Sequence, residues 1–263
     1  MTNIERREEI PVTDETDILV VGGGPAGVCA ALSAARQGCD VTVIEQTNAM
    51  GGIATSGLHG HICIFTPWAD SSQRIVGGIP HELAETTVER GYGEYNGRNH
   101  FDFEVEPFKL ILEEKLQEAD VDFLYHTMFS DVVMNDGEID AVIIQNKTGR
   151  QAIRAKRVID CTGDGDVAAR AGAPFEKGRE TDGGTQPMTL MFQIGGVDME
   201  RLSEFRGEGY EEKYGAEDSS GLSQVWKEAQ ENGDMEPFQT KVMGFWWTPT
   251  RPDQLGINFT HIT

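Results

Sequence analysis

The chain has 263 residues, of which 38% are hydrophobic and 25% charged, enough to bury a core in one or two domains. Its 44 acidic side chains outnumber 22 basic ones, and the net charge of −22 repels nucleic acid and anionic lipid surfaces. The acidic residues are spread along the chain, which fits an ordinary acidic enzyme and, with a slight preference, a halophilic protein in a high-salt cytoplasm.

The cysteines and the first residues predict a cytoplasmic protein without a metal site. Cys29, Cys39, Cys63 and Cys161 form no CxxC pair, whereas zinc and iron–sulfur sites need closely spaced thiolates. Reduced thiols are therefore expected. Residues 1–16 are polar and lack the apolar segment of a secretory signal, so they predict a flexible leader. The sequence contains no stretch of about 18 apolar residues, so no membrane span is predicted.

A strand–turn–helix–strand unit follows this leader. The apolar run at 17–21 predicts a buried strand, and a glycine-rich turn at 22–27 comes directly after it. Small residues at 28–37 predict a helix that packs closely on a sheet, and 41–45 predicts a second strand. This order within about 30 residues is typical of a βαβ unit.

Further elements extend this domain to residue 172. An irregular insertion is expected at about 56–106. Asp-Gly and Thr-Gly turns between short apolar runs predict a β-meander. The expected elements are helices at 79–90, 107–119 and 167–171 and strands at 121–126, 130–134, 139–145, 153–155 and 157–160.

The pattern changes beyond residue 172. Strands are expected at 187–194, 241–247 and 255–262, with an acidic helical segment at 199–233. The predicted fold class is therefore α/β. A Rossmann-like domain with a parallel sheet and a β-meander covers 17–172, and part of a mixed α+β substrate domain covers 173–263.

The glycine turn carries a GxGxxG motif whose context predicts dinucleotide binding. Gly22 allows the tight turn, Gly24 lets the backbone approach a pyrophosphate, and Gly27 lets the helix pack closely on the strand. The helix start offers unpaired N–H groups and a partial positive charge to phosphates. Glu45 follows roughly 20 residues later, where an acid accepts from a ribose hydroxyl and disfavours NADP.

Several strings resemble the two-dinucleotide-binding-domain flavoproteins and, within them, the FAD-dependent oxidoreductase family. They are DILVVGGGPAGVCAALSAARQGCDVTVIEQ, GGIATSGL, CTGDGDVAARAGAPFEKGRE and QPMTLMF, and the resemblance covers essentially the whole chain. It implies FAD as the cofactor. The residues that it implies for FAD binding are Gly22, Gly24, Pro25, Ala26, Gly27, Glu45, Gln46, Gly52, Ile53, Ala54, Thr55, Thr162, Gly163 and Asp164.

The resemblance implies an oxidoreductase that transfers hydride from an unidentified small-molecule donor to flavin N5 and passes electrons to an unidentified acceptor. Two alternatives stay open: a non-catalytic FAD-binding or electron-relay subunit, and a NAD-dependent dehydrogenase, which the meander and the Thr-Gly-Asp element disfavour. Members of the family usually run well past 263 residues. The resemblance therefore implies that the chain is a fragment and that a second chain or a homo-oligomer completes its flavin domain. Without that completing segment, weak FAD binding and no turnover are expected.

Several polar residues outside the motif are candidates for catalysis. His59, His61 and Cys63 alternate along the chain and would share one face of an extended segment. Acid–base chemistry by His59 or His61 is preferred there over a metal site, a covalent flavin link or purely local hydrogen bonding, because histidine titrates near neutrality. Arg74 could clamp a substrate carboxylate, although an ordinary surface role is as well supported.

Overall fold

The computed structural model describes most of the chain, in two compact units. The described residues are 8–62, 75–96, 100–204, 220–235 and 244–258. The first unit comprises Met1–Gly52 and Glu113–Phe175, and the second comprises Ile53–Leu112 and Glu176–Thr263. The helix α3, Val105–Glu118, passes from the second unit into the first at Leu112.

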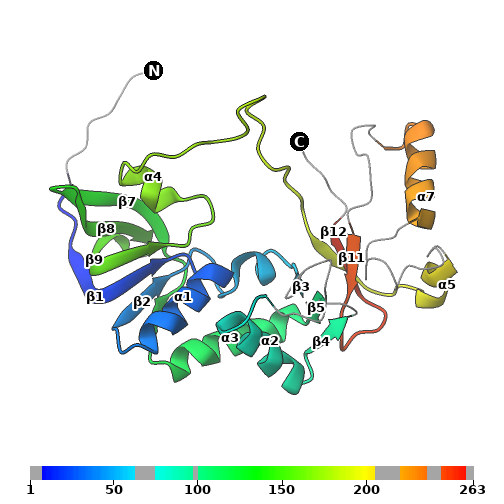
Figure 1. Ribbon diagram of the computed structural model, residues 1–263, viewed down its shortest axis with the longest axis horizontal. Helices are drawn as coiled ribbons and strands as arrows, with labels where there is room; N and C mark the ends of the chain where they lie inside the picture. Colours follow the sequence, from blue (N-terminus) through cyan, green and yellow to red (C-terminus); the bar gives the residue numbers. More distant parts are fainter. Residues whose placement is uncertain (1–7, 63–74, 97–99, 205–219, 236–243, 259–263) are drawn as a thin grey trace. The chain divides into compact units, whose positions relative to one another are not determined.

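The first unit is built on a six-stranded mixed sheet of order β6-β2-β1-β9-β8-β7 (Figure 1). The strands β6, β2, β1 and β9 are parallel, and β9, β8 and β7 form an antiparallel meander. Their bounds are β1 Val12–Val21, β2 Val41–Ile44, β6 Asp122–Leu124, β7 Met128–Asn135, β8 Glu138–Asn146 and β9 Gly149–Asp160. The Rossmann-like α/β class that the sequence predicts is confirmed.

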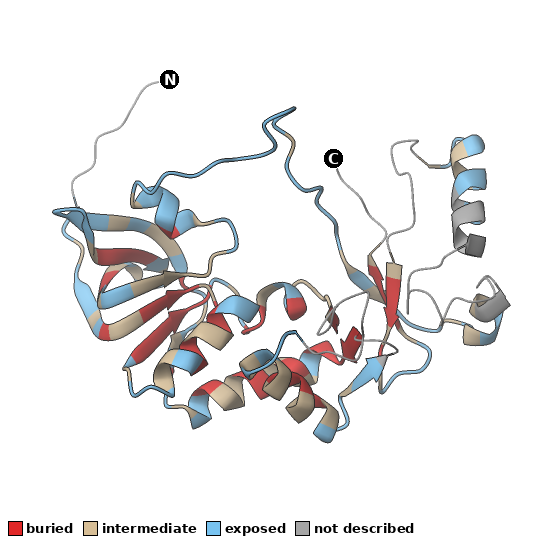
Figure 2. Ribbon diagram, in the orientation of Figure 1, coloured by how far each residue is buried: buried red, intermediate tan, exposed pale blue. Residues whose placement is uncertain are grey.

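Two helices of this unit follow strands of the sheet. The helix α1, Pro25–Ala35, packs against β1 and β2, and the short α4, Asp166–Arg170, packs against β7 and β9. Buried side chains concentrate on the central strands (Figure 2), where fully burying one contributes about 1.5–3 kcal/mol. One cluster of this core comprises Leu19, Val21, Ile44, Val142, Ile144, Ile153 and Val167.

Long pairing between β1 and β9 changes two expectations. β1 begins at Val12, so residues 12–16 are strand and not part of a flexible leader. They pair with β9, in a register that runs from Val12 opposite Ala152 to Val21 opposite Asp160. The strands expected separately at 153–155 and 157–160 are one continuous strand for the same reason. A partner strand of equal length satisfies backbone groups that the sequence alone leaves unassigned.

The second unit contains two three-stranded antiparallel sheets, of order β3-β5-β4 and β10-β12-β11. The predicted insertion at 56–106 belongs here, and its described residues include α2 and the first of these sheets, so it is not wholly irregular. The bounds are β3 His61–Ile62, β4 Gly93–Asn96, β5 His100–Phe103, β10 Phe192–Ile194, β11 Gly244–Trp247, β12 Leu255–Asn258, α2 Ile79–Glu89, α5 Met199–Glu204, α7 Ser220–Glu231 and the 3-10 turn η1 Gly52–Ala54.

The strand expected at 187–194 is shortened to β10, because only its last residues pair with β12. Residues 241–243 and 259–262, which the sequence assigns to the neighbouring strands, lie outside the described residues. Within the described part of the chain, every helix is too short or too polar to cross a bilayer.

Candidate functional site

The three motif glycines lack a side chain for different reasons. Gly22 has φ +101°, and a Cβ there would lie 2.4 Å from the carbonyl oxygen of Cys161. A Cβ on Gly27 would lie 1.9 Å from Gly22 O. Gly24 differs, because its φ of −65° suits any residue and no described atom lies within 4 Å of its Cβ position. This open position fits a ligand that comes close to the backbone.

The helix α1 begins beside Gly24 with uncapped backbone donors. Among the described residues no side chain caps the helix, no acidic residue lies in its first turn, and Pro25 has no N–H to satisfy. The first helical hydrogen bond runs from Val28 N to Gly24 O at 3.0 Å, so the N–H groups of Ala26 and Gly27 precede it. These donors and the helix dipole favour a phosphate group.

The second predicted glycine segment packs on the first. Gly51 N donates to Gly23 O at 2.7 Å, and a Cβ on Gly52 would lie 3.0 Å from Gly24 Cα. The structure therefore brings Gly52 and the motif together at one place. The other predicted residues of this segment begin the second unit: Ile53, Ala54 and Thr55.

Glu45 is buried and ties the glycine turn to the second strand. Its Oε2 accepts from Gly23 N at 2.8 Å, and its Oε1 accepts from Thr47 N at 2.7 Å. The sequence predicts a ribose-binding role for Glu45, but these two backbone contacts are not readable from it. A carboxylate has about four acceptor positions, so it can hold both amides and still accept from a hydroxyl. Gln46, beside it, is exposed.

Asp160 organises the loop that follows β9, and the sequence gives only its place at a strand end as a signal. It accepts from Thr162 N at 3.1 Å, Thr162 Oγ1 at 2.7 Å and Ala168 N at 2.9 Å. Partial burial works to raise the pKa of this carboxyl, but the hydrogen bonds outweigh it and lower the pKa. Thr162 Oγ1 in turn accepts from Asp166 N. The predicted Gly163 and Asp164 are exposed within this loop.

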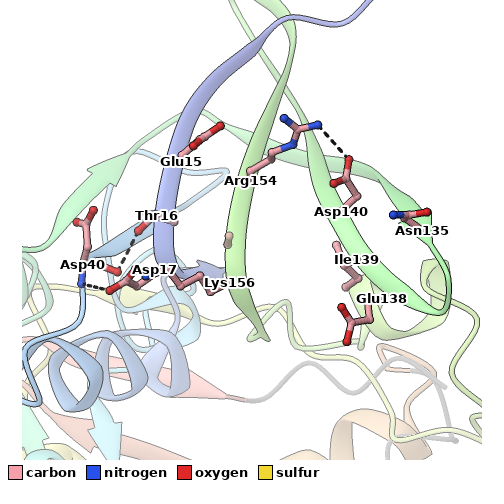
Figure 3. Close-up of a pocket in the computed structure, with 11 residues that line it drawn as sticks. Glu15, Thr16, Asp17, Asp40, Asn135, Glu138, Ile139, Asp140, Arg154 and Lys156 are labelled. Atoms are coloured by element: carbon pink, nitrogen blue, oxygen red, sulfur yellow. Dashed lines mark hydrogen bonds and ion pairs between the residues drawn. The ribbon is translucent and has the colours of Figure 1, made fainter.

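The glycine turn, the segment at Glu45 and the loop after Asp160 leave the same edge of the sheet, since they follow the carboxyl ends of the parallel strands β1, β2 and β9. Ligands of open α/β sheets bind at such an edge. A surface pocket of about 460 Å³ lies elsewhere, toward the amino ends of β1 and β2 (Figure 3). Its cations are already paired, Lys156 with Asp17 and Arg154 with Asp140 at 3.3 Å. It is therefore not the candidate dinucleotide site.

A second polar site lies within the second unit, around His61. His61 Nδ1 donates to Asp102 Oδ1 at 2.5 Å, and His100 Nδ1 lies 3.1 Å from His61 Nε2. All three side chains are buried, Asp102 completely. His59, the other predicted acid–base residue, contacts the ring of Trp246 instead, with ring centroids 5.0 Å apart.

Burial separates the two predicted histidines chemically. Desolvation, followed by the charge of His61, lowers the pKa of His59 from 6.5 to about 4. His59 is therefore neutral at pH 7, whereas His61 contacts the carboxylate of Asp102. The remaining candidates, Cys63 and Arg74, lie outside the described residues. The described residues contain no group of three His, Cys, Asp or Glu side chains arranged to hold a metal ion.

A parallel sheet with a β-meander, and a glycine turn that opens a helix at the carboxyl end of β1, is the arrangement of dinucleotide-binding proteins. Residues 17–263 match the family described as FAD dependent oxidoreductase, and the chain belongs to that family. The family membership confirms FAD as the cofactor that the sequence predicts. The open Gly24 position and the uncapped start of α1 fit the pyrophosphate of FAD.

Two curated relatives each match somewhat more than half of the chain. The chain is 28% identical to digeranylgeranylglycerophospholipid reductase 1 of Methanococcoides burtonii, over 57% of this chain and 38% of the relative. It is 28% identical to thiamine thiazole synthase of Aeropyrum pernix, over 59% of this chain and 57% of the relative. The chain thus spans less than two thirds of the length of these relatives.

A solved structure shows the same fold over more of the chain. A triple mutant of a flavin-dependent brominase matches with a TM-score of 0.57 and 17% identity, over 93% of this chain and 57% of the brominase chain. At this identity the match supports the fold alone. It includes residues of both units, so the likeness is not limited to the dinucleotide-binding sheet.

Proposed function

We propose that the protein oxidises a small-molecule donor by transferring hydride to the N5 atom of FAD, with the diphosphate held at the start of α1. The open position at Gly24 carries the proposal, because neither the backbone conformation nor the packing of the described residues requires a glycine there. Bound flavin would supply the two-electron chemistry. The protein would supply binding, orientation and a shielded site.

The roles of the residues follow from their positions. Gly24, Ala26 and Gly27 present backbone to the diphosphate, and Gly52 keeps the neighbouring turn close to it. Glu45 accepts from the adenosine ribose while it holds the glycine turn in place. Thr162, Gly163 and Asp164 contact the other side of the cofactor from a loop that Asp160 holds.

A visible spectrum of the purified 263-residue chain tests this proposal. We expect yellow protein with the absorption bands of oxidised flavin. Anaerobic bleaching by an alcohol, an amine or a sugar would support an oxidoreductase that uses such a donor. Flavin that bleaches only with dithionite would favour the alternative of a relay subunit. Protein that binds no flavin but binds NADH would contradict the proposal and favour a dehydrogenase.

A further inference from the structure

We infer that Tyr125 is a positioning residue for FAD, because its hydroxyl fixes the loop that joins the ribose acid Glu45 to the second glycine segment. The inference rests on the proposed placement of the diphosphate at the start of α1. All of the contacts that support it lie within the first unit. Tyr125 directly follows β6, far along the chain from both glycine segments, and belongs to no motif that the sequence singles out.

The loop at residues 45–52 makes three contacts with Gly23, in the middle of the glycine turn. Glu45 Oε2 accepts from Gly23 N at 2.8 Å, and Gly51 N donates to Gly23 O at 2.7 Å. The side chain of Met50, which is completely buried, packs against the same residue, since a Cβ on Gly23 would lie 2.3 Å from Met50 Sδ. The position of this loop therefore sets the position of the glycine turn.

Tyr125 holds the backbone of this loop at Met50. Its hydroxyl oxygen accepts from the backbone N–H of Met50, and the hydroxyl donates to Glu113 Oε2 on α3 at 2.9 Å. Glu45 N donates to Leu124 O at 2.9 Å, so the backbone next to Tyr125 is itself fixed to the start of the loop. One hydroxyl thus connects the loop to a helix and to the end of β6.

The two hydrogen bonds of the Tyr125 hydroxyl have fixed directions. An ionised Glu113 can only accept, and a backbone N–H can only donate. Burial, followed by the hydrogen bond and the charge of Glu113, raises the pKa of Tyr125, and the N–H of Met50 opposes this with a smaller effect. The phenol therefore keeps its proton at neutral pH. Phenylalanine would fill the same space without serving either neighbour.

The proposed FAD site uses both ends of this loop. Glu45 at one end accepts from the ribose, and the glycine segment at the other end lies against the turn that meets the diphosphate. A loop that is already held in its binding conformation loses less conformational freedom when the cofactor binds. Tyr125 thus acts on FAD through Met50 and Gly23, and its loss should weaken binding.

Titrations of the flavin-free protein with FAD and with ADP test this role. ADP carries the adenosine ribose and the diphosphate without the flavin. Tyr125→Phe should raise the Kd of both ligands by the same factor, about 3- to 10-fold, as expected for the loss of a hydrogen bond. Glu113→Gln keeps an acceptor for the hydroxyl and should bind both ligands as the wild type does.

Tyr95→Phe is the matched control. Tyr95 also donates to a carboxylate, Glu85 Oε1, at 2.7 Å, but this pair is exposed and lies in the second unit. The control removes the same kind of hydrogen bond and should leave both Kd values unchanged.

Methionine-methyl NMR on the flavin-free protein reports on the loop itself. The Met50 methyl group lies next to Gly23, so its signal should shift or broaden in Tyr125→Phe and stay as in the wild type in Glu113→Gln and Tyr95→Phe. An unchanged Met50 signal in Tyr125→Phe would overturn the inference.

The outcomes separate this inference from the proposed function. Unchanged Kd values in Tyr125→Phe, with binding weakened in Gly24→Ala, would overturn the inference alone, even if the melting temperature of Tyr125→Phe fell. Wild-type protein that binds neither FAD nor ADP would overturn both. If Tyr125→Phe does not fold, Glu113→Leu takes its place, because it leaves the hydroxyl without its acceptor; wild-type Kd values in that variant would overturn the inference.

Discussion

Substitution of Gly24 separates binding of FAD from folding of the protein. An alanine Cβ at position 24 meets no described atom within 4 Å, and φ −65° with ψ −177° is an ordinary extended conformation. Replacing glycine at a compatible position stabilises a protein by about 0.4–1 kcal/mol. Gly24 is also the N-cap of α1, where alanine is less favourable by an amount of order 1 kcal/mol. The two effects nearly cancel, so Gly24→Ala should leave the melting temperature of the flavin-free protein within a few degrees of the wild type.

The same methyl group should weaken FAD binding strongly, because it occupies the space through which the diphosphate reaches the backbone. Overpacking by a methyl group typically costs about 1–3 kcal/mol. Since about 1.4 kcal/mol is tenfold in affinity, the Kd for FAD should rise about 5- to 150-fold. Flavin fluorescence titration of the apoprotein measures this change.

Gly27→Ala is the contrasting variant. Its Cβ would lie 1.9 Å from the carbonyl oxygen of Gly22, so backbone must move and the fold itself should lose stability. Calorimetry on the apoprotein should therefore show a clear fall in melting temperature for Gly27→Ala and not for Gly24→Ala. A Gly24→Ala protein that binds FAD within twofold of the wild type would refute the assignment of this position to the diphosphate.

Three further variants test the residues around the site. Glu45→Gln places an amide where two backbone N–H groups need acceptors, so unfolding free energy should fall by about 1–3 kcal/mol in urea titrations, together with FAD affinity. Folding lowers the pKa of the Asp160 carboxyl from 3.8. The stability that this shift contributes is present above the unfolded pKa of 3.8 and is lost as pH falls through the folded pKa. Asp160→Asn removes the carboxyl, so the variant should lose less stability than the wild type on acidification. His59→Gln removes a histidine whose pKa falls from 6.5 to about 4, and the wild type should lose up to about 3 kcal/mol as pH falls through that interval while the variant should not. A pH dependence of urea unfolding that is the same in wild type and variant would contradict either pH assignment.

Local signals in the sequence were sufficient for the first helix and strand of the dinucleotide-binding unit. The helix expected at 28–37 is α1, and the strand expected at 41–45 is β2, because hydrophobic runs and glycine positions report directly on local backbone. Long-range pairing was not readable in the same way. Val12 is exposed and is followed by polar residues in the sequence. It nevertheless belongs to β1, because β9 is long enough to pair with it.

The candidate sites show the same division. His61 was identifiable from its neighbours in the sequence, but Asp102 lies 41 positions away and becomes its partner only through the register of β3 and β5. Asp160 could be placed at a strand end, but its three hydrogen bonds depend on how the following loop turns back.

The sequence by itself determined the GxGxxG turn, the helix that follows it and the acid at the end of the second strand, because these features depend on residues within about one βαβ unit. Only the tertiary structure decided that Gly24 is open while Gly22 and Gly27 are required by packing, since all three are the same residue in the same motif. It also decided which histidine has a carboxylate partner. Spacing along a chain sets which groups are available, whereas strand register and packing set which of them meet.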